Sequence, residues 1–248
     1  MSTSDESTRD GGFVLRWWAA SLLAYGGAVL VCTAAAFPVV LAGWAVVRTA
    51  FIHAGITGGA LALAFSLAAG YLACGALLLA LLCCVARLVT DGWEGERDVG
   101  DPRNLGFFLV SAVRVFARHG FLPLLTGTPF IVAYYRAMGA TIGSGTMIFT
   151  TEVSDCRLVE IGRDCTLGVD CVIQCHSGRA GRWVRRRVVI GDRVTIGRGA
   201  LVMPGATIED GVTVGAKSFV PGDSHLEQGK TYGGVPAREL SDADESGV

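Results

Sequence analysis

The sequence predicts a mainly β protein in which a parallel β-helix follows a hairpin of two transmembrane α-helices. Two observations support this prediction. An aliphatic residue recurs at every sixth position from residue 190 onward, and two long segments in the N-terminal third contain no charged residue. A period of six residues is typical of a triangular β-helix, in which three hexapeptides, about 18 residues, complete one coil.

The repeat is clearest between residues 190 and 225. Six consecutive hexapeptides begin with Ile or Val and have a narrow residue at the fifth position: IGDRVT, IGRGAL, VMPGAT, IEDGVT, VGAKSF and VPGDSH. The first residue is expected to fill the interior of the coil, and the fifth to lie near a corner. Further hexapeptides begin at Ile142, Ile148, Ile161 and Leu167. A slip of one residue within 154–160 separates the hexapeptides at Ile142 and Ile148 from those at Ile161 and Leu167, and we interpret it as a bulge or corner adjustment. The pattern predicts roughly four coils between Ile142 and Ser224.

The two uncharged segments are residues 17–47 and 58–86, and each is longer than the roughly 20 residues that cross a bilayer. A cleaved signal peptide is not expected, because the leader is acidic and the apolar stretch exceeds a signal h-region. Composition agrees, since 51% hydrophobic content and a formal charge of −1 suit one soluble domain with a membrane region. We therefore predict two transmembrane helices.

Charges around these helices predict their orientation. Arg48 alone lies in the connection, whereas five arginines flank the pair: Arg9, Arg16, Arg87, Arg97 and Arg103. The positive-inside rule then places both termini and the β-helix on the cytoplasmic side of the cell membrane. Reduced thiols are expected there, at Cys156, Cys165, Cys171 and Cys175. A zinc site is not expected, because there is neither a CxxC motif nor convincing Cys/His spacing.

A linker rich in Gly and charge, residues 90–103, precedes a predicted amphipathic helix at 104–120. Ser111, Arg114 and Arg118 are spaced to share one face, opposite Phe108, Leu109, Ala112 and Phe116. This helix is expected either to lie in the membrane interface or to pack on the open end of the β-helix. The predicted organisation is an N-terminal tail (1–16), two transmembrane helices (17–89), a linker with interfacial helices (90–135), the β-helix (136–240) and a disordered acidic tail (241–248).

The candidate catalytic residue lies where the repeat is interrupted. After His176 roughly a dozen residues depart from the pattern before Ile190 restores it, which predicts an extruded loop. His176 is the only histidine within the predicted coils, and a long loop on a rigid scaffold usually carries function. Cys175 beside it suggests a covalent route, but adjacent residues of a strand point to opposite faces. We therefore expect Cys175 to be a core residue if it faces inward.

The loop is rich in arginine. It contains Trp183 together with Arg179, Arg182, Arg185, Arg186 and Arg187. Such a cluster is either simply solvated or attracts an anionic group, which would be the phosphates of a donor, an acidic carrier protein or lipid headgroups. Nucleic acid is not an expected partner, because the chain is near neutral and no recognition motif accompanies the loop.

Residues 128–240 resemble the hexapeptide-repeat acyltransferases, which include maltose, galactoside and serine acetyltransferases. The resemblance rests on a His before an extruded loop and on coils that end in GGVPAREL, residues 233–240. It implies a left-handed β-helix, a homotrimer and direct acyl transfer from a thioester to a hydroxyl or an amine, with His176 as general base. Asp170 falls where galactoside acetyltransferases carry an Asn that contacts the acceptor. Lys217 and Arg238 would lie near the pantetheine or phosphates of the donor.

A second resemblance covers more of the chain. The two apolar helices and the segments LTGTPFIVAYYRAMGATIG from Leu125, DCRLVEIG from Asp155 and DCVIQCH from Asp170 are similar to one membrane-embedded hexapeptide domain of the ε-poly-lysine synthetase family. That family carries three such domains in tandem, thought to join carrier-bound aminoacyl groups. This chain has one copy and no adenylation or carrier domain. It also has Thr195 where the sugar acetyltransferases have an aromatic residue.

These observations predict a membrane-anchored acyltransferase. The co-substrate would be an acyl-CoA or a phosphopantetheine thioester, with no permanently bound cofactor. The acceptor is expected to be a small molecule or a peptide, contacted by Asp170, Thr195, Arg198 and Trp183, and the donor-binding candidates are Arg185, Arg186, Arg187, Lys217 and Arg238. Two alternatives stay open. One is a stand-alone amide-bond-forming domain of peptide biosynthesis that acts with a separate adenylation or carrier protein, and the other is a non-catalytic trimeric membrane scaffold.

Overall fold

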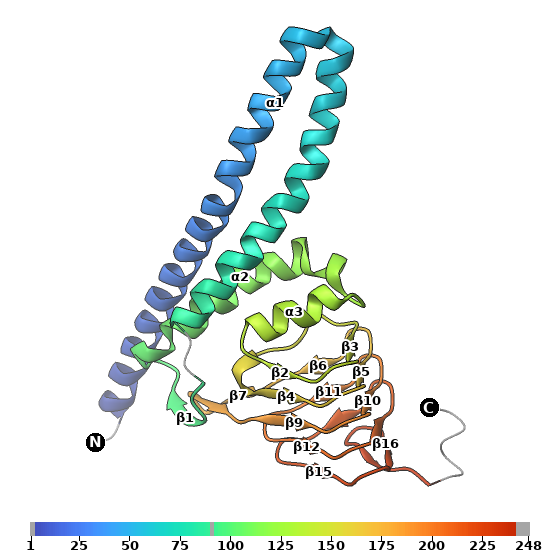
Figure 1. The fold of residues 1–248 in the computed structure, drawn as a ribbon. Helices are drawn as coiled ribbons and strands as arrows, with labels where there is room; N and C mark the ends of the chain where they lie inside the picture. The colour runs from blue at the N-terminus through green and yellow to red at the C-terminus, as the bar shows by residue number, and fades with distance from the viewer. Residues whose placement is uncertain (1–2, 90–91, 242–248) are drawn as a thin grey trace. The chain divides into compact units, whose positions relative to one another are not determined.

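The computed structural model describes residues 3–89 and 92–241 (Figure 1). The predicted acidic tail lies outside these residues, apart from residue 241. The chain forms two compact units. We call Met1–Thr90 with Pro102–Phe121 the helical unit, and Asp91–Asp101 with Leu122–Val248 the β-helix unit. The predicted linker is thus divided, because residues 92–101 belong to the β-helix unit and the helix that follows belongs to the helical unit.

Two arms that run antiparallel to each other make up helix α1, Thr3–Val89 (Figure 1). The helix breaks at Gly55, whose backbone has φ 66° and ψ −161°, a conformation that a residue with a side chain rarely adopts. The break is therefore at Gly55, whereas Pro38 lies within helical structure. Helix α1 begins at Thr3, so it includes most of the predicted N-terminal tail. Its segment Tyr25–Val89 has the length and mean hydropathy, 2.5, of a candidate membrane-spanning helix.

Helix α2, Leu105–Gly120, follows the 3-10 turn η1, Pro102–Asn104, and packs against both arms of α1. A Cβ added to Gly27 would overlap the side chain of Leu109, and one added to Gly106 would overlap the carbonyl of Val89. The buried side chains of α2 are Val110, Ala112, Val113 and Ala117. The helix and the burial of Ala112 agree with the predicted amphipathic pattern, whereas Phe116 is 45% exposed.

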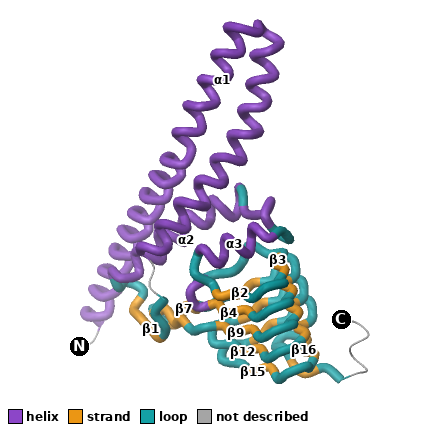
Figure 2. Tube along the Cα trace, viewed as in Figure 1, coloured by secondary structure: helices purple, strands orange, loops and turns teal. Residues whose placement is uncertain are grey.

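The β-helix has three faces, each a ladder of short parallel strands (Figures 1 and 2). The first face comprises β2 (Thr141–Ile142), β4 (Val159–Ile161), β9 (Val188–Ile190), β12 (Thr207–Ile208) and β15 (His225–Leu226). The second comprises β3 (Met147–Ile148), β5 (Thr166–Leu167), β10 (Thr195–Ile196), β13 (Thr213–Val214), β16 (Thr231–Gly233) and the antiparallel β17 (Arg238–Glu239). The third comprises β6 (Val172–Ile173), β11 (Leu201–Val202) and β14 (Phe219–Val220).

The regular coils have the predicted period, since Ile190 pairs with Ile208, 18 residues further along the chain. The first residues of the hexapeptides, such as Ile196 and Val202, are fully buried. So are the residues at the fifth position: Cys165, Cys171, Val194, Ala200, Ala206 and Val212. The predicted pattern of interior and corner residues is confirmed, and the fold is the hexapeptide-repeat β-helix. The coils extend past Ser224 to β16.

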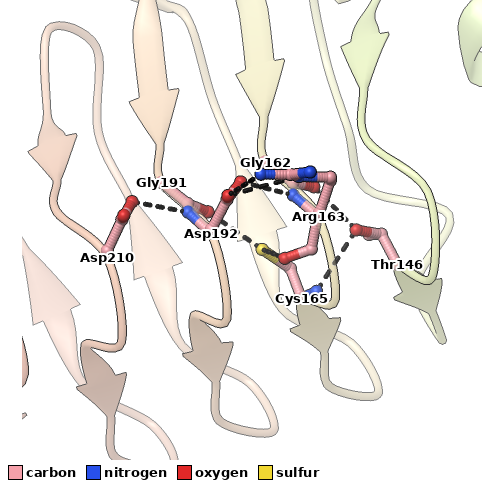
Figure 3. A network of polar contacts seen from close by, with 7 residues as sticks. All are labelled: Thr146, Gly162, Arg163, Cys165, Gly191, Asp192 and Asp210. Carbon is pink, nitrogen blue, oxygen red and sulfur yellow. Dashed lines mark hydrogen bonds and ion pairs between the residues drawn. The ribbon is translucent and has the colours of Figure 1, made fainter.

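Polar contacts along one corner join successive coils (Figure 3). A carboxylate oxygen of Asp192 accepts from the backbone N–H of Arg163 at 2.8 Å, and one of Asp210 accepts from the N–H of Asp192 at the same distance. The thiol of Cys165 donates to the carbonyl of Gly191 at 3.0 Å. Each turn therefore satisfies backbone groups of its neighbour, which keeps the stack of coils rigid.

Helix α3, Pro129–Ala137, covers the open N-terminal end of the β-helix. The hydroxyl of Thr128 caps its N-terminus by accepting from the N–H of Phe130, and Pro129 occupies the first turn. The guanidinium of Arg136 donates to the carbonyl of Ile142 at 2.7 and 3.0 Å, and the hydroxyl of Tyr135 donates to that of Thr150. The β-helix unit thus includes this helix, which the sequence analysis had grouped with interfacial elements.

The two irregularities of the repeat occur at one corner, between the third and the first face. In the first, Ile142 pairs with Ile161, 19 residues away instead of 18, and the 3-10 turn η3 (Cys156–Leu158) lies between their strands. In the second, Ile161 pairs with Ile190, 29 residues away. The predicted corner adjustment and the extruded segment are both confirmed. Because they occur at the same corner of successive coils, they lie next to each other in the stack.

Candidate active site

The extruded segment is a β-hairpin and not an irregular loop. Strand β7, His176–Arg179, pairs antiparallel with β8, Arg182–Arg185, and Ala180 and Gly181 form the turn between them with positive φ. A third strand, β1 (Gly95–Asp98), pairs antiparallel with β8 along its whole length. The predicted linker therefore supplies an edge strand to the hairpin that carries His176.

His176 lies at the base of this hairpin and contacts a buried carboxylate. Its Nδ1 is 2.5 Å from Oδ2 of Asp155, whose side chain is 1% exposed, while the imidazole is 20% exposed. Asp155 precedes η3 with φ 48°, a left-handed conformation that Asp tolerates better than most residues. The slip in the repeat thus places an acid directly against the candidate base.

Arg185 is the register partner of His176 and contacts the same acid. Its Nη2 is 2.9 Å from Oδ1 of Asp155, and its side chain is 6% exposed. One carboxylate oxygen of Asp155 therefore faces the imidazole and the other faces a guanidinium. A buried carboxylate needs such partners, because burying an unpaired charge is costly.

Two further contacts position His176. The ring of Trp183 meets the imidazole edge-on, with 5.0 Å between the ring centroids and an angle of 81° between the planes. The side-chain amide of Gln174 donates to the backbone carbonyl of His176 at 2.8 Å. The imidazole is thus held on one side by a carboxylate and on another by an aromatic ring. Trp183, predicted as a substrate contact, is brought to the site.

Cys175 is a core residue and faces away from the site. Its side chain is fully buried, and its thiol donates to the carbonyl of Leu158 at 3.5 Å. Burial, and next the negative charge of Asp155, raise the pKa of this thiol, so it stays protonated at neutral pH. Among the described residues there is also no cluster of three His, Cys, Asp or Glu side chains that would hold a metal ion.

Arginines of the hairpin pair with acids of the same chain, so part of the positive charge of the hairpin is neutralised. Arg186 pairs with Asp223, and Arg182 lies 3.1 Å from Glu96. Arg187 bridges Glu94, at 3.0 Å, and Glu160. Arg185 is buried on Asp155, as described above. The side chain of Arg179 lies outside the described residues.

Three other predicted site residues lie at a different corner, between the second and third faces. Asp170, Arg198 and Lys217 occupy this corner in three successive coils, and Oδ2 of Asp170 is 3.9 Å from Nη2 of Arg198. All three are exposed, as are Thr195 on the second face and Arg238 in β17. One protomer therefore does not bring these residues together with His176, which lies at the corner between the third and first faces.

Neither Asp155 nor Trp93 is among the site residues predicted from the sequence. The ring centroid of Trp93 lies 5.1 Å from Cζ of Arg185 and 4.0 Å from Cζ of Arg97. A signal for Asp155 was present, since it lies within the one-residue slip. Trp93 gave no signal, because its contacts depend on the pairing of β1 with a hairpin almost 90 residues further along the chain.

A comparison with models of protein families also identifies the hexapeptide repeat. Residues 187–222 match the family model described as bacterial transferase hexapeptide (six repeats). The curated proteins include no match to the chain.

Solved structures with similarity to this chain include a hexapeptide-repeat-containing acetyltransferase from Vibrio cholerae, at 19% identity over 46% of this chain and 79% of that one, with a TM-score of 0.39. A galactoside acetyltransferase in complex with coenzyme A has 17% identity over 47% of this chain and 71% of that one, with a TM-score of 0.37. Soybean serine acetyltransferase has 19% identity over 82% of this chain and 69% of that one, with a TM-score of 0.37. These scores are low, and the fold rests on the strand register within this chain.

Proposed function

We propose that this protein is an acyltransferase that moves an acyl or aminoacyl group from a thioester to a hydroxyl or an amine, with His176 as general base. The observation that carries the proposal is the 2.5 Å contact between His176 Nδ1 and Asp155 Oδ2. It occurs at a partly exposed imidazole, at the point where a hexapeptide β-helix is interrupted. The resemblance to hexapeptide acyltransferases supports the reaction class.

The geometry suggests how the proton moves. Donation of Nδ1–H to Asp155 fixes the tautomer in which Nε2 carries the lone pair. Nε2 would accept the proton of the acceptor O–H or N–H while the acceptor oxygen or nitrogen attacks the thioester carbon. The tetrahedral intermediate then collapses, the carbon–sulfur bond breaks, and the departing sulfur takes up the proton from the imidazolium. Asp155 stabilises that imidazolium. General base catalysis of this kind contributes about 10² to 10⁴-fold to the rate.

An acyl-enzyme on Cys175 has no place in this mechanism. The thiol faces the core and remains protonated, whereas a nucleophilic cysteine must be a thiolate that the substrate can reach. Transfer is therefore proposed to be direct.

The donor is proposed to be coenzyme A or, alternatively, the phosphopantetheine arm of a carrier protein. With the hairpin arginines paired to acids, Lys217 and Arg238 are the cations that we assign to donor binding, and both are exposed. Asp170, Thr195 and Arg198 are assigned to the acceptor. These residues would have to come from a neighbouring protomer to meet His176, so the proposed active form is a homotrimer.

We further propose that the two arms of α1 anchor the enzyme in the cell membrane, with the β-helix on the cytoplasmic side. Large apolar side chains are exposed along both arms, among them Leu30, Phe37, Leu41, Leu61, Phe65 and Leu72. Water would be a poor environment for so much exposed apolar surface, and lipid a favourable one.

The test is release of free thiol from acetyl-CoA and from acyl-loaded carrier protein, offered with a panel of amines and alcohols to the full chain in mild detergent. We expect His176→Gln to lower kcat/KM by at least about 10² with an unchanged melting temperature. The matched control is His225→Gln, because His225 is exposed and pairs with Glu209 at 2.9 Å on the first face. Equal activity of both variants would refute the mechanism, and binding of membrane partners without any thiol release would favour the scaffold.

A further inference from the structure

A short segment before the β-helix is built onto the candidate active site. We call residues 93–98 the strap: they comprise Trp93, Glu94 and strand β1. The strap pairs with β8 from Gly95 opposite Arg185 to Asp98 opposite Arg182, and the N–H of Val99 then donates to the carbonyl of Gly181 at 3.0 Å. The strap therefore runs along β8 from the base of the hairpin, where Arg185 pairs with His176, to the turn of the hairpin.

The base of the strap covers Arg185. The ring of Trp93 lies 5.1 Å from the guanidinium carbon of Arg185, and Nη2 of this buried side chain is 2.9 Å from Oδ1 of Asp155. An aromatic ring attracts a guanidinium through its electron-rich face. It also excludes water, which strengthens the attraction between Arg185 and Asp155. The strap thus stabilises the position of Arg185 on the carboxylate.

Arg185 affects His176 through this carboxylate. A lone Asp155 would stabilise the protonated imidazole and raise its proton affinity, whereas the positive charge of Arg185 offsets part of that field. Titratable groups near the pair include the thiols of Cys156 and Cys175, and burial raises the pKa of Cys175, so this thiol stays neutral. Arg97, on the same Trp93 ring, adds positive charge on the strap side.

We propose that the strap holds Arg185 on Asp155 and so limits the negative field at the His176 imidazole, with Trp93 as the positioning residue. The consequence for turnover rests on the proposed function, but the arrangement of charges does not. Loss of Trp93 would loosen Arg185, increase the net negative charge felt by the imidazole and favour its protonation.

The experiment has a readout that needs no catalysis. The ring resonances of His176 are titrated by NMR in the full chain in detergent, and assigned by their loss in His176→Gln. The other three histidines serve as internal references. We expect Trp93→Ala to raise the titration midpoint of His176 by about half a pH unit or more, and Trp93→Phe to restore it. The acid limb of kcat/KM should move to higher pH by the same amount, because a larger fraction of the base is then protonated.

The control is Glu96→Gln, which removes the exposed ion pair with Arg182 at the far end of the strap and leaves Arg185 untouched. It should not move the midpoint. If Trp93→Ala does not fold, Trp93→Leu fills the space without the aromatic ring and should shift the midpoint in the same direction. An unchanged midpoint in a folded Trp93 variant overturns the strap proposal even if the enzyme is active. A shifted midpoint with no turnover on any donor supports the strap while counting against the proposed function.

Discussion

Asp155 and His176 lie at the same corner of successive coils and contact each other at 2.5 Å, although 21 residues separate them in the chain. Each comes from an interruption of the hexapeptide repeat. The slip turns Asp155 inward at η3, and the extruded hairpin begins with His176. The two departures from the repeat therefore build one site.

The first prediction concerns Asp155→Asn. The left-handed conformation at this position suits Asn, so the backbone should not change. The neutral amide cannot stabilise an imidazolium, and it leaves Arg185 buried without a carboxylate. We expect kcat/KM to fall by about 10² or more, and the free energy of unfolding in urea to fall by about 3 kcal/mol.

The control for this prediction is Asp223→Asn. Asp223 pairs with Arg186, and both side chains are about half exposed. Exposed ion pairs contribute only about 0 to 1 kcal/mol, so this variant should keep its stability and its activity. Activity of Asp155→Asn within threefold of the wild type would contradict the assigned role of Asp155.

The sequence predicted the β-helix well because its repeat is local. An aliphatic residue at every sixth position indicates which side chains fill the interior of the coil. Ile196, Val202 and Val214 are all fully buried. His176 could be found because it begins the interruption. The pairing of β1 with β8 could not, because a four-residue strand rich in Gly and charge carries no alternating pattern. The ion pairs of Arg182 with Glu96 and of Arg187 with Glu94 were missed for the same reason, since Glu94 and Glu96 reach the hairpin only through this pairing.

The second prediction concerns pH and the buried thiol of Cys171. Burial, and next the charge of Asp170, raise its pKa from 9.0 to about 12. The folded state therefore keeps the proton that the unfolded state releases above pH 9, so stability is full below pH 9 and falls as the pH rises toward 12. We expect wild type to lose about 1.4 kcal/mol more than Cys171→Ala between pH 8 and pH 10 in urea unfolding.

Alanine is a suitable replacement at this position. The register places Cys171 directly below Ala200, because Val172 pairs with Leu201. The substitution thus introduces the residue that the next coil already uses. Parallel pH profiles for the two proteins would show that this thiol ionises equally in the folded and unfolded states.

The third prediction tests the membrane hairpin and its orientation. The arms of α1 meet at Gly55, so an epitope inserted after Gly55 lies at the tip and should disturb neither arm. In intact cells we expect an antibody to reach this epitope, while an epitope at the C-terminus becomes accessible only after permeabilisation. Access to the C-terminal epitope in intact cells would reverse the proposed orientation. Release of the protein from membranes by alkaline carbonate would exclude an integral anchor.

The fourth prediction concerns assembly. His176 occupies the corner between the third and first faces, and Lys217 the corner between the second and third. A shared site thus needs His176 from one protomer and Lys217 from a neighbour. We propose a trimer, because the resemblance to the hexapeptide-repeat acyltransferases implies that assembly. Mass measurement in mild detergent should therefore give three chains, and a persistent, active monomer would contradict this.

Subunit mixing tests the shared site directly. His176→Ala removes the base, and Lys217→Glu repels the donor phosphates, so each variant alone should be nearly inactive at low donor concentration. In mixed trimers a site regains function when its His176 comes from a Lys217→Glu chain and its Lys217 from a His176→Ala chain. Random assembly of equal amounts creates such a pair at about one site in four, so we expect about a quarter of wild-type activity on co-expression. The control is wild type co-expressed with a chain that carries both His176→Ala and Lys217→Glu. It measures the effect of diluting wild-type chains with chains that supply neither residue. If co-expression gives no more activity than the two variants purified separately, His176 and Lys217 do not serve one site between protomers, and the donor must be bound by residues of the same chain.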